Sequence, residues 1–419
     1  MVTPRQHAEP TTAGPLGRSG DPGEHPLLPL ARRVARQLAA PATVGSSFIA
    51  GSVTAGLGNH TSDIDVYLVG TELAPARRQL VLDRSRFDVQ ELSVADLDAA
   101  VGRVAGAAFP GDGSTVVAQR DLDLAVRLWS GEVITDDGAL APLRDRLRAA
   151  PLPLRRALIT HWLTAVHYEL EDVAGLVANG DPDAGLMAAR TALLLAGKAV
   201  AAACGDFYTG RKWVWHQLRR AAPSGFPYEG FRYLLRYDPL ADGTGAGGGS
   251  GTPAGGLSSI AGFTQGCLSA VATLGWHGIP LEHWLCWPGV SDRSGVSDRS
   301  GVSDRSGVSD RPGVSDRSEP GSTAPVGSQQ VPGLLRRAPG FSPRAHSGGV
   351  VLALPALRRV RLNPDVALVW ALCDGAPPST VTGRAQKLRE AHPAYAGLTP
   401  DRCAVIIERL VAARLVEAL

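Results

Sequence analysis

A six-residue repeat is the feature that most limits what this chain can fold into. The unit GVSDRS recurs in register five times from Gly289 to Ser318, with Pro312 in place of serine in the fourth copy. One valine per unit cannot build an apolar face, and the Asp and Arg charges of each unit cancel. We therefore expect a disordered linker over 288–348, followed by a separate C-terminal module at 349–419.

Two other segments also have the composition of unfolded chain. Residues 1–26 are rich in Pro, Gly and charge without apolar periodicity, so we expect disorder there. The Gly-rich stretch 243–256 is expected to be a flexible insertion. It contains the spacing GxGxxG, but it neither follows a predicted strand nor opens a predicted helix, which argues against a dinucleotide site.

Composition excludes several classes of protein. The 419 residues suggest two or three domains, and a net charge of +2 predicts neither a broad nucleic-acid-binding surface nor an acidic solvating chain. The N-terminus has no apolar signal-peptide core, and the longest apolar helix, at about 184–204, carries Arg190 and Lys198. We expect a cytoplasmic protein with no membrane span. We expect free thiols at all five cysteines, Cys204, Cys267, Cys286, Cys373 and Cys403.

Hydrophobic periodicity divides the long N-terminal part in two. A helical pattern at 26–40 is followed by short β-type runs, and Ser93 with Asp96 has the spacing of a helix-capping box. Together they predict an α+β domain with a small mixed sheet over 27–150, and an all-α domain over 151–287. The expected strands are 47–52, 63–69 and 86–92, and the further helices of the first domain are 93–107, 114–131 and 138–149.

The strand run DIDVYLV carries the strongest chemical signal. Asp63 and Asp65 are two residues apart, so both carboxylates point to one face of a strand and repel each other unless cations lie between them. Gly51 and Ser52 end the preceding strand, where a phosphate can approach the backbone, and Asp88 lies on the next strand. This set predicts a centre with two magnesium ions for phosphoryl or nucleotidyl transfer. The structural alternative is a pair of aspartates at a solvent-facing strand edge.

The chain resembles the nucleotidyltransferase superfamily typified by DNA polymerase β, and within it the antibiotic nucleotidyltransferases. The resemblance lies in the order of three motifs: GS, then DxD in a strand, then a lone Asp in a later strand. The resemblance covers about residues 28–240. It implies that Asp63 and Asp65 bind both magnesium ions and that Gly51 and Ser52 hold a nucleoside triphosphate (NTP). Asp88 would complete the metal site as, or beside, the general base. The implied reaction is attack of an acceptor oxygen on the α-phosphorus, with release of pyrophosphate.

The helical domain offers weaker candidates. The resemblance implies that a cation such as Lys212, in YTGRKW, reaches the triphosphate; the alternative is a solvated helix end. Arg190 and Lys198 are eight residues apart on similar helix faces and could do the same. Three other polar residues fit a helix surface better than a catalytic role: His161, His167 and Glu169.

The C-terminal module has its own pattern. VVLAL and RRVRLN read as a β-pair, and PDVALVWALCDG reads as a helix with Pro364 in its first turn, ahead of two more helices. The module resembles the PqqD-like, winged-helix-like family in three features: LN before the first helix, CDG at the end of that helix, and the last helix. The resemblance implies binding of a leader peptide by β-strand addition. A generic winged helix on DNA is the alternative, since the basic RRVR fits either partner.

Together these patterns predict a magnesium-dependent nucleotidyltransferase joined to a peptide-recognition module, in the biosynthesis of modified peptides. Two alternatives stay open. One is an enzyme that modifies an antibiotic or another small hydroxylated molecule, and the other is a non-catalytic peptide-binding adaptor. The NTP, the acceptor and the oligomeric state are not determined by the sequence.

Overall fold

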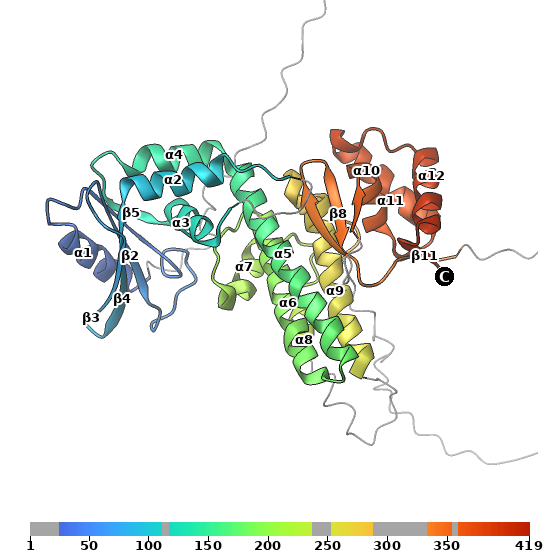
Figure 1. Ribbon diagram of the computed structural model, residues 1–419, viewed down its shortest axis with the longest axis horizontal. Helices are drawn as coiled ribbons and strands as arrows, with labels where there is room; N and C mark the ends of the chain where they lie inside the picture. Colours follow the sequence, from blue (N-terminus) through green and yellow to red (C-terminus); the bar gives the residue numbers. More distant parts are fainter. Residues whose placement is uncertain (1–24, 111–116, 237–252, 288–332, 354–358) are drawn as a thin grey trace, which may run out of the picture.

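The computed structural model describes residues 25–110, 117–236, 253–287, 333–353 and 359–419. It is a mixed α+β structure in which a small sheet, a group of long helices and a C-terminal part follow one another along the long axis (Figure 1). The expected disorder at 1–24 and in the repeat 289–318 lies outside the described residues.

The N-terminal sheet has the strand order β3-β4-β2-β1-β5 and is mixed, because β2 and β4 run parallel while the other pairs are antiparallel. This confirms the α+β class and the small mixed sheet. The strands are β1 (Ser46–Ala50), β2 (Ile64–Gly70), β3 (Ala76–Leu82), β4 (Ser85–Ser93) and β5 (Glu132–Thr135).

Alternation along the strands separates two apolar layers. Ile49 and Val66 face α1 (Leu28–Leu38), whereas Phe48 and Tyr67 face the layer formed by α2 (Val94–Ala105), α3 (Gln119–Ser130) and α4 (Leu140–Ala149), as Figure 1 shows. At the start of α2, the Ser93 hydroxyl accepts the Asp96 N–H at 2.9 Å, which confirms the predicted cap.

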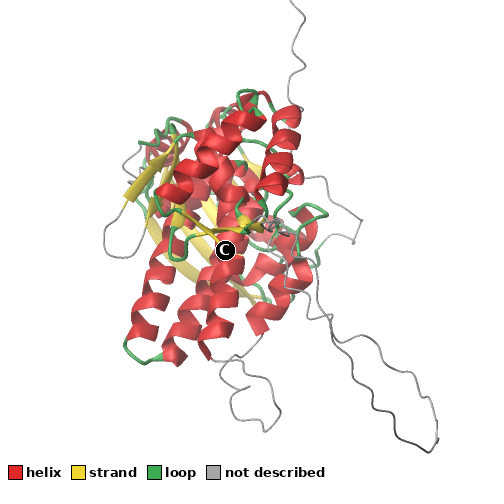
Figure 2. Ribbon diagram, turned by 90° about the vertical axis from the view of Figure 1, so that its right-hand side faces the viewer, coloured by secondary structure: helices red, strands yellow, loops and turns green. Residues whose placement is uncertain are grey.

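Long helices form the centre of the molecule. In Figure 2, which is turned by 90° from Figure 1, these helices extend below the strands. The helices are α5 (Pro151–Ala178), α6 (Pro182–Ala203), α7 (Val214–Ala221), α8 (Tyr228–Arg236) and α9 (Pro253–Thr273), with short 3₁₀ turns at Arg211–Trp213, Gly275–His277 and Leu281–His283.

Two of these helices are long and apolar enough to cross a membrane by length and composition. They are Pro182–Ala203 and Gly256–His277, and 72% of each apolar window is buried inside the protein. Burial of this extent is what core helices require, because their apolar side chains then contact protein on all sides.

The described residues of the C-terminal part form two small sheets and three helices. One sheet has the order β7-β8-β9, and its β8 to β9 pairing confirms the predicted β-pair; the other has the order β10-β6-β11. The strands are β6 (Leu335–Arg337), β7 (Ser342–His346), β8 (Gly349–Ala353), β9 (Arg359–Leu362), β10 (Asp374–Ala376) and β11 (Val416–Ala418). The helices are α10 (Pro364–Leu372), α11 (Pro378–Ala391) and α12 (Pro400–Ala412), with a 3₁₀ turn at Pro393–Tyr395.

Several predicted boundaries are wrong. Strands β6 and β7 lie inside the range 288–348 expected to be linker, and α9 begins at Pro253, inside the Gly-rich range 243–256. The rest of both ranges, 243–252 and 288–332, lies outside the described residues. Strands β3 and β5 were not predicted at all. The C-terminal part also shares one apolar core with the long helices, so it is packed against them.

Candidate functional site

The Gly-Ser turn lies beside the aspartates, as predicted. Ala50, the last residue of β1, is in register with Asp65 on β2, and Asp65 is in register with Asp88 on β4. Gly51 has φ +93°, and a Cβ at this position would overlap the Oδ2 atom of Asp65. The turn therefore requires glycine both for its backbone conformation and for the close approach of the carboxylate.

Each aspartate contacts an arginine from a different element. Asp65 pairs with Arg127 of α3 at 2.7 Å, and Asp63, just before β2, pairs with Arg86 of β4. Asp88 is 7% exposed; its carboxylate accepts hydrogen bonds from Arg77 at 3.0 Å and from Gln79 at 2.8 Å, both on the neighbouring strand β3. These contacts come from long-range pairing and were not predicted.

The electrostatics of Asp65 reflect this crowding. Burial raises the pKa of its carboxyl, the Arg127 guanidinium opposes that rise, and the negative charges of Asp88 and Asp63 add to it. The three carboxylates therefore repel one another in the way that a bound cation relieves. The Arg127 guanidinium also lies 5.8 Å from the ring centroid of Tyr67, which is two residues after Asp65 on β2.

The donor chemistry of this trio fits magnesium, which prefers carboxylate oxygens. Within the described ranges, however, no group of three or more His, Cys, Asp or Glu side chains converges closely enough to hold a metal ion. The guanidinium groups of Arg86, Arg127 and Arg77 contact the carboxylates instead. A metal ion held by Asp63, Asp65 and Asp88 would have to replace some of these arginine contacts.

Lys198, one of the weaker candidates for a triphosphate contact, is a buried residue with 1% exposure. Its ammonium donates to the backbone carbonyls of Tyr208 and Gly210 and to the side-chain oxygen of Gln217. Burial lowers its pKa to about 7. Three acceptors match the three protons of an ammonium group, so Lys198 holds the loop that follows α6.

That loop touches the Gly-Ser turn. Tyr208 shares a hydrogen bond with Ser52, and burial raises the pKa of its phenol. Arg220 of α7 donates to the carbonyl of Ala55 at 2.7 Å and pairs with Asp206 at 2.6 Å. The helical part thus contacts the turn at two points, and neither Tyr208 nor Arg220 was singled out from the sequence.

The remaining helical candidates are spread out. Lys212 is exposed at the 3₁₀ turn and lies 5.5 Å from the ring of Trp213. His167 is buried against β7, where it shares a hydrogen bond with Ser342. His161 packs edge-on against Trp162. The packing expected for both histidines is observed.

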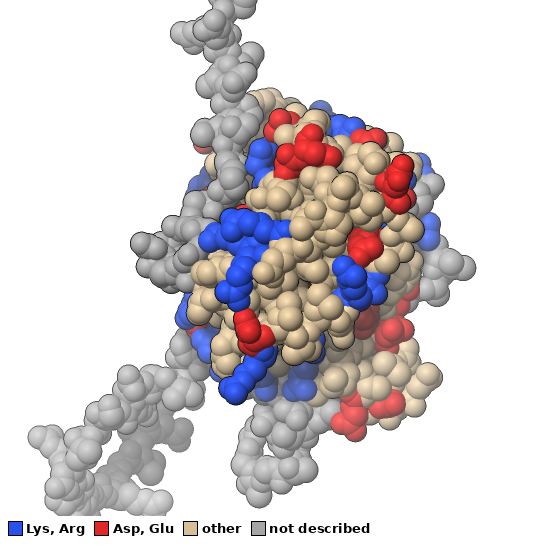
Figure 3. Space-filling view, turned by 90° about the vertical axis from the view of Figure 1, so that its left-hand side faces the viewer, with Lys and Arg blue, Asp and Glu red and all other residues tan. Residues whose placement is uncertain are grey.

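The outer face of the sheet end carries both signs of charge. Figure 3 shows Lys and Arg in separate groups, with Asp and Glu between them and a broad area of other residues at the centre. This face therefore offers no continuous basic surface of the kind that nucleic-acid backbones require.

Comparisons with known proteins add little. No protein-family model matches the chain, and no curated protein matches it. Among solved structures, the chain is similar to a nucleotidyltransferase-like protein from Exiguobacterium sibiricum, with 12% identity over 55% of this chain and 71% of that chain. The TM-score of this match is 0.32.

Proposed function

We propose that this chain is a magnesium-dependent nucleotidyltransferase that moves a nucleoside monophosphate from an NTP to an acceptor hydroxyl. One observation carries the proposal: a turn that only glycine can form places Ser52 beside a trio of mutually repelling carboxylates. Such a trio is suited to cations and to the phosphates that they bind.

In this proposal Asp63, Asp65 and Asp88 hold the magnesium ions, which would neutralise charge on the triphosphate and orient it. Gly51 leaves room for a phosphate at the backbone, and the Ser52 hydroxyl can donate to it. Arg127 and Arg86, freed from the aspartates, would remain as nearby cations for the phosphate oxygens. Lys212, which is exposed at the 3₁₀ turn, would be a further cation for the triphosphate.

The test is metal-dependent release of pyrophosphate from each of the four NTPs. We expect activity with magnesium, and loss of at least 100-fold in Asp63→Ala and in Asp65→Ala, since each removes a charge on which the site depends. Asp83→Asn is the control, because Asp83 lies in the exposed hairpin turn between β3 and β4 and pairs only with Arg33 among the described residues. Full activity in both alanine variants would refute the proposal.

For the acceptor, we propose a peptide bound by the C-terminal part, in the manner of PqqD-like domains. The supporting feature is β9, which is a terminal strand of its sheet and bears the exposed residues Arg359 and Arg361. A terminal strand can pair with an added strand, and the arginines favour an acidic one. Offering labelled NTP with an acidic leader-type peptide, with hydroxylated small molecules or with neither separates this acceptor from the small-molecule alternative.

A further inference from the structure

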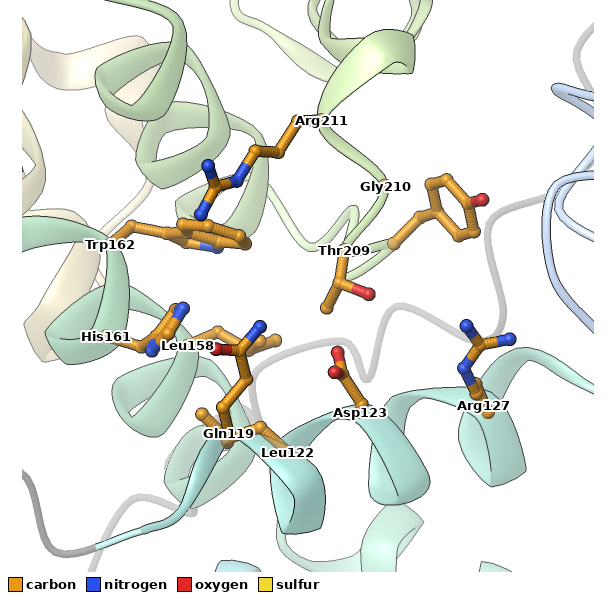
Figure 4. Close-up of a pocket in the computed structure, with 11 residues that line it drawn as sticks. Gln119, Leu122, Asp123, Arg127, Leu158, His161, Trp162, Thr209, Gly210 and Arg211 are labelled. Carbon is orange, nitrogen blue, oxygen red and sulfur yellow. The ribbon is translucent and has the colours of Figure 1, made fainter. Parts of the chain in front are cut away.

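A cavity adjoins the aspartate site on its helical side. Its volume is about 190 Å³, and it lies between α3, α5 and the loop that follows α6 (Figure 4). Its lining includes the side chains of Gln119, Asp123, Arg127, His161, Trp162 and Tyr208.

The cavity is continuous with the Gly-Ser and aspartate site. Arg127 lines it and pairs with Asp65, and Tyr208 lines it and is hydrogen-bonded to Ser52. Arg127, Asp123 and Gln119 are four residues apart on one face of α3, so the row is roughly 12 Å long at 1.5 Å per residue. Figure 4 shows Arg127 at one end of this row and Gln119, with His161 and Trp162, at the other.

The walls suit one flat ring. A cavity of about 190 Å³ is smaller than the roughly 300–1,000 Å³ that whole drug-sized ligands occupy, so it admits a single ring system. Trp162 and Tyr208 supply aromatic surfaces, and bases stack on such surfaces. Burial lowers the pKa of His161, so this ring is neutral at pH 7 and can donate or accept a hydrogen bond.

Asp123 would determine which nucleobase the cavity prefers. It is half-buried, points toward Thr209 and interacts electrostatically with Arg127 and His161, but it forms no hydrogen bond or ion pair with any residue that the structure describes. A carboxylate only accepts hydrogen bonds. Among the four common bases, guanine alone has two adjacent donors, N1–H and the 2-amino group, which one carboxylate can accept together. The facing edges of adenine, cytosine and uracil each place a ring acceptor or a carbonyl next to the single donor.

We propose that this cavity is the nucleobase subsite of the NTP and that Asp123 makes it prefer guanine. The inference rests on the proposed function, because the triphosphate is assigned to the adjoining site. The triphosphate would lie at Gly51, Ser52 and the aspartates, and the base would lie along α3 beyond Arg127.

Equilibrium binding tests this without any turnover. The full chain is titrated with non-hydrolysable analogues of GTP, ITP, ATP, CTP and UTP in the presence of magnesium. We expect the GTP analogue to bind at least about tenfold tighter than the ATP analogue. The ITP analogue, which lacks the 2-amino group, should fall between them. In Asp123→Asn the difference between GTP and ITP should disappear, while Asp83→Asn should keep it.

The outcomes separate the two proposals. Equal affinity for all five analogues, or an unchanged preference in Asp123→Asn, overturns the guanine subsite even if pyrophosphate is released. Absence of both binding and pyrophosphate release overturns the proposed function itself. If Asp123→Asn leaves GTP binding intact but impairs transfer to an added acceptor, the cavity holds the acceptor, and the nucleobase assignment is wrong. Trp162→Leu provides a second variant, expected to weaken all purine analogues alike.

Discussion

The long helices meet a different neighbour on each side, and the two junctions differ in chemistry (Figure 1). Toward the sheet, apolar packing is joined by charged and polar contacts, such as Arg220 with the Ala55 carbonyl, and a cavity lies among them; we call this the polar junction. Toward the C-terminal part, apolar side chains form a continuous core, and the buried Tyr395 hydroxyl donates to the Thr273 carbonyl at 2.8 Å. A junction with a cavity can bind a ligand. A junction filled by side chains, here called the dry junction, chiefly holds the two parts together.

The largest expected effect is at the polar junction. Gly51→Ala should lower nucleotidyl transfer on the order of 100-fold, because its Cβ would displace the Asp65 carboxylate and its φ of +93° is unfavourable for alanine. Gly56→Ala is the matched control. It shares a positive φ, +68°, but nothing lies within 4 Å of its Cβ. Pyrophosphate release from both variants checks this, and equal losses would show that backbone strain alone is responsible.

A second test concerns the buried lysine at the same junction. Lys198→Met removes one donor from each of the carbonyls of Tyr208 and Gly210, which keep only the Gln217 amide and the Trp213 N–H, so the loop beside Ser52 should loosen. We expect about a tenfold rise in KM for NTP. Lys387→Met, at an exposed position on α11, should change nothing.

The same variant makes a pH prediction. The folded pKa of Lys198 is about 7, below the value near 10.4 of an exposed lysine, so between these values the unfolded chain binds a proton that the folded chain does not. Stability of the wild type should therefore rise with pH from 7 toward 10. Denaturant unfolding across this range should show a smaller rise in Lys198→Met, and an identical slope would mean that Lys198 is not buried as described.

Sequence patterns predicted the parts of the site that lie close together in the chain. The strand with Asp63 and Asp65, the Gly51 turn and the Ser93 cap were all predictable from local spacing. Strand β3 was not, because its sequence ARRQLVL has no clear alternation and it is exposed along most of its length at the sheet edge. Strand β6 forms only by pairing with β10 and β11, which local composition cannot reveal.

The arginines at the site were unpredictable for the same reason. Arg127 is 62 residues after Asp65 in the chain, and it meets the carboxylate only because α3 packs on that face of the sheet. The available signal was weak: Asp123 and Arg127 are polar and one turn apart on an amphipathic helix that carries several other polar residues. Lys198 was noticed only as a weak candidate, since its position on a helix face gives no information about which acceptors surround it.

The smallest expected effect is at the dry junction, where His167 of α5 is buried against Ser342 of β7. Burial and the nearby Arg344 lower its pKa to about 4, so between pH 6.5 and 4 the unfolded chain binds a proton that the folded chain does not. Stability should therefore fall as pH falls through this window. In His167→Gln the fall should be shallower, with a loss of only about 1 kcal/mol at pH 7.

His60→Gln, at an exposed position in the loop before β2, is the matched control and should leave the pH dependence unchanged. Chemical denaturation at half-unit pH steps measures both variants, and pyrophosphate release at pH 7.5 should equal the wild-type rate in each. A strong loss of activity in His167→Gln would break the comparison, because it would show that the dry junction controls the polar one through α5. Unchanged activity with altered acid stability would restrict His167 to holding the C-terminal part in place.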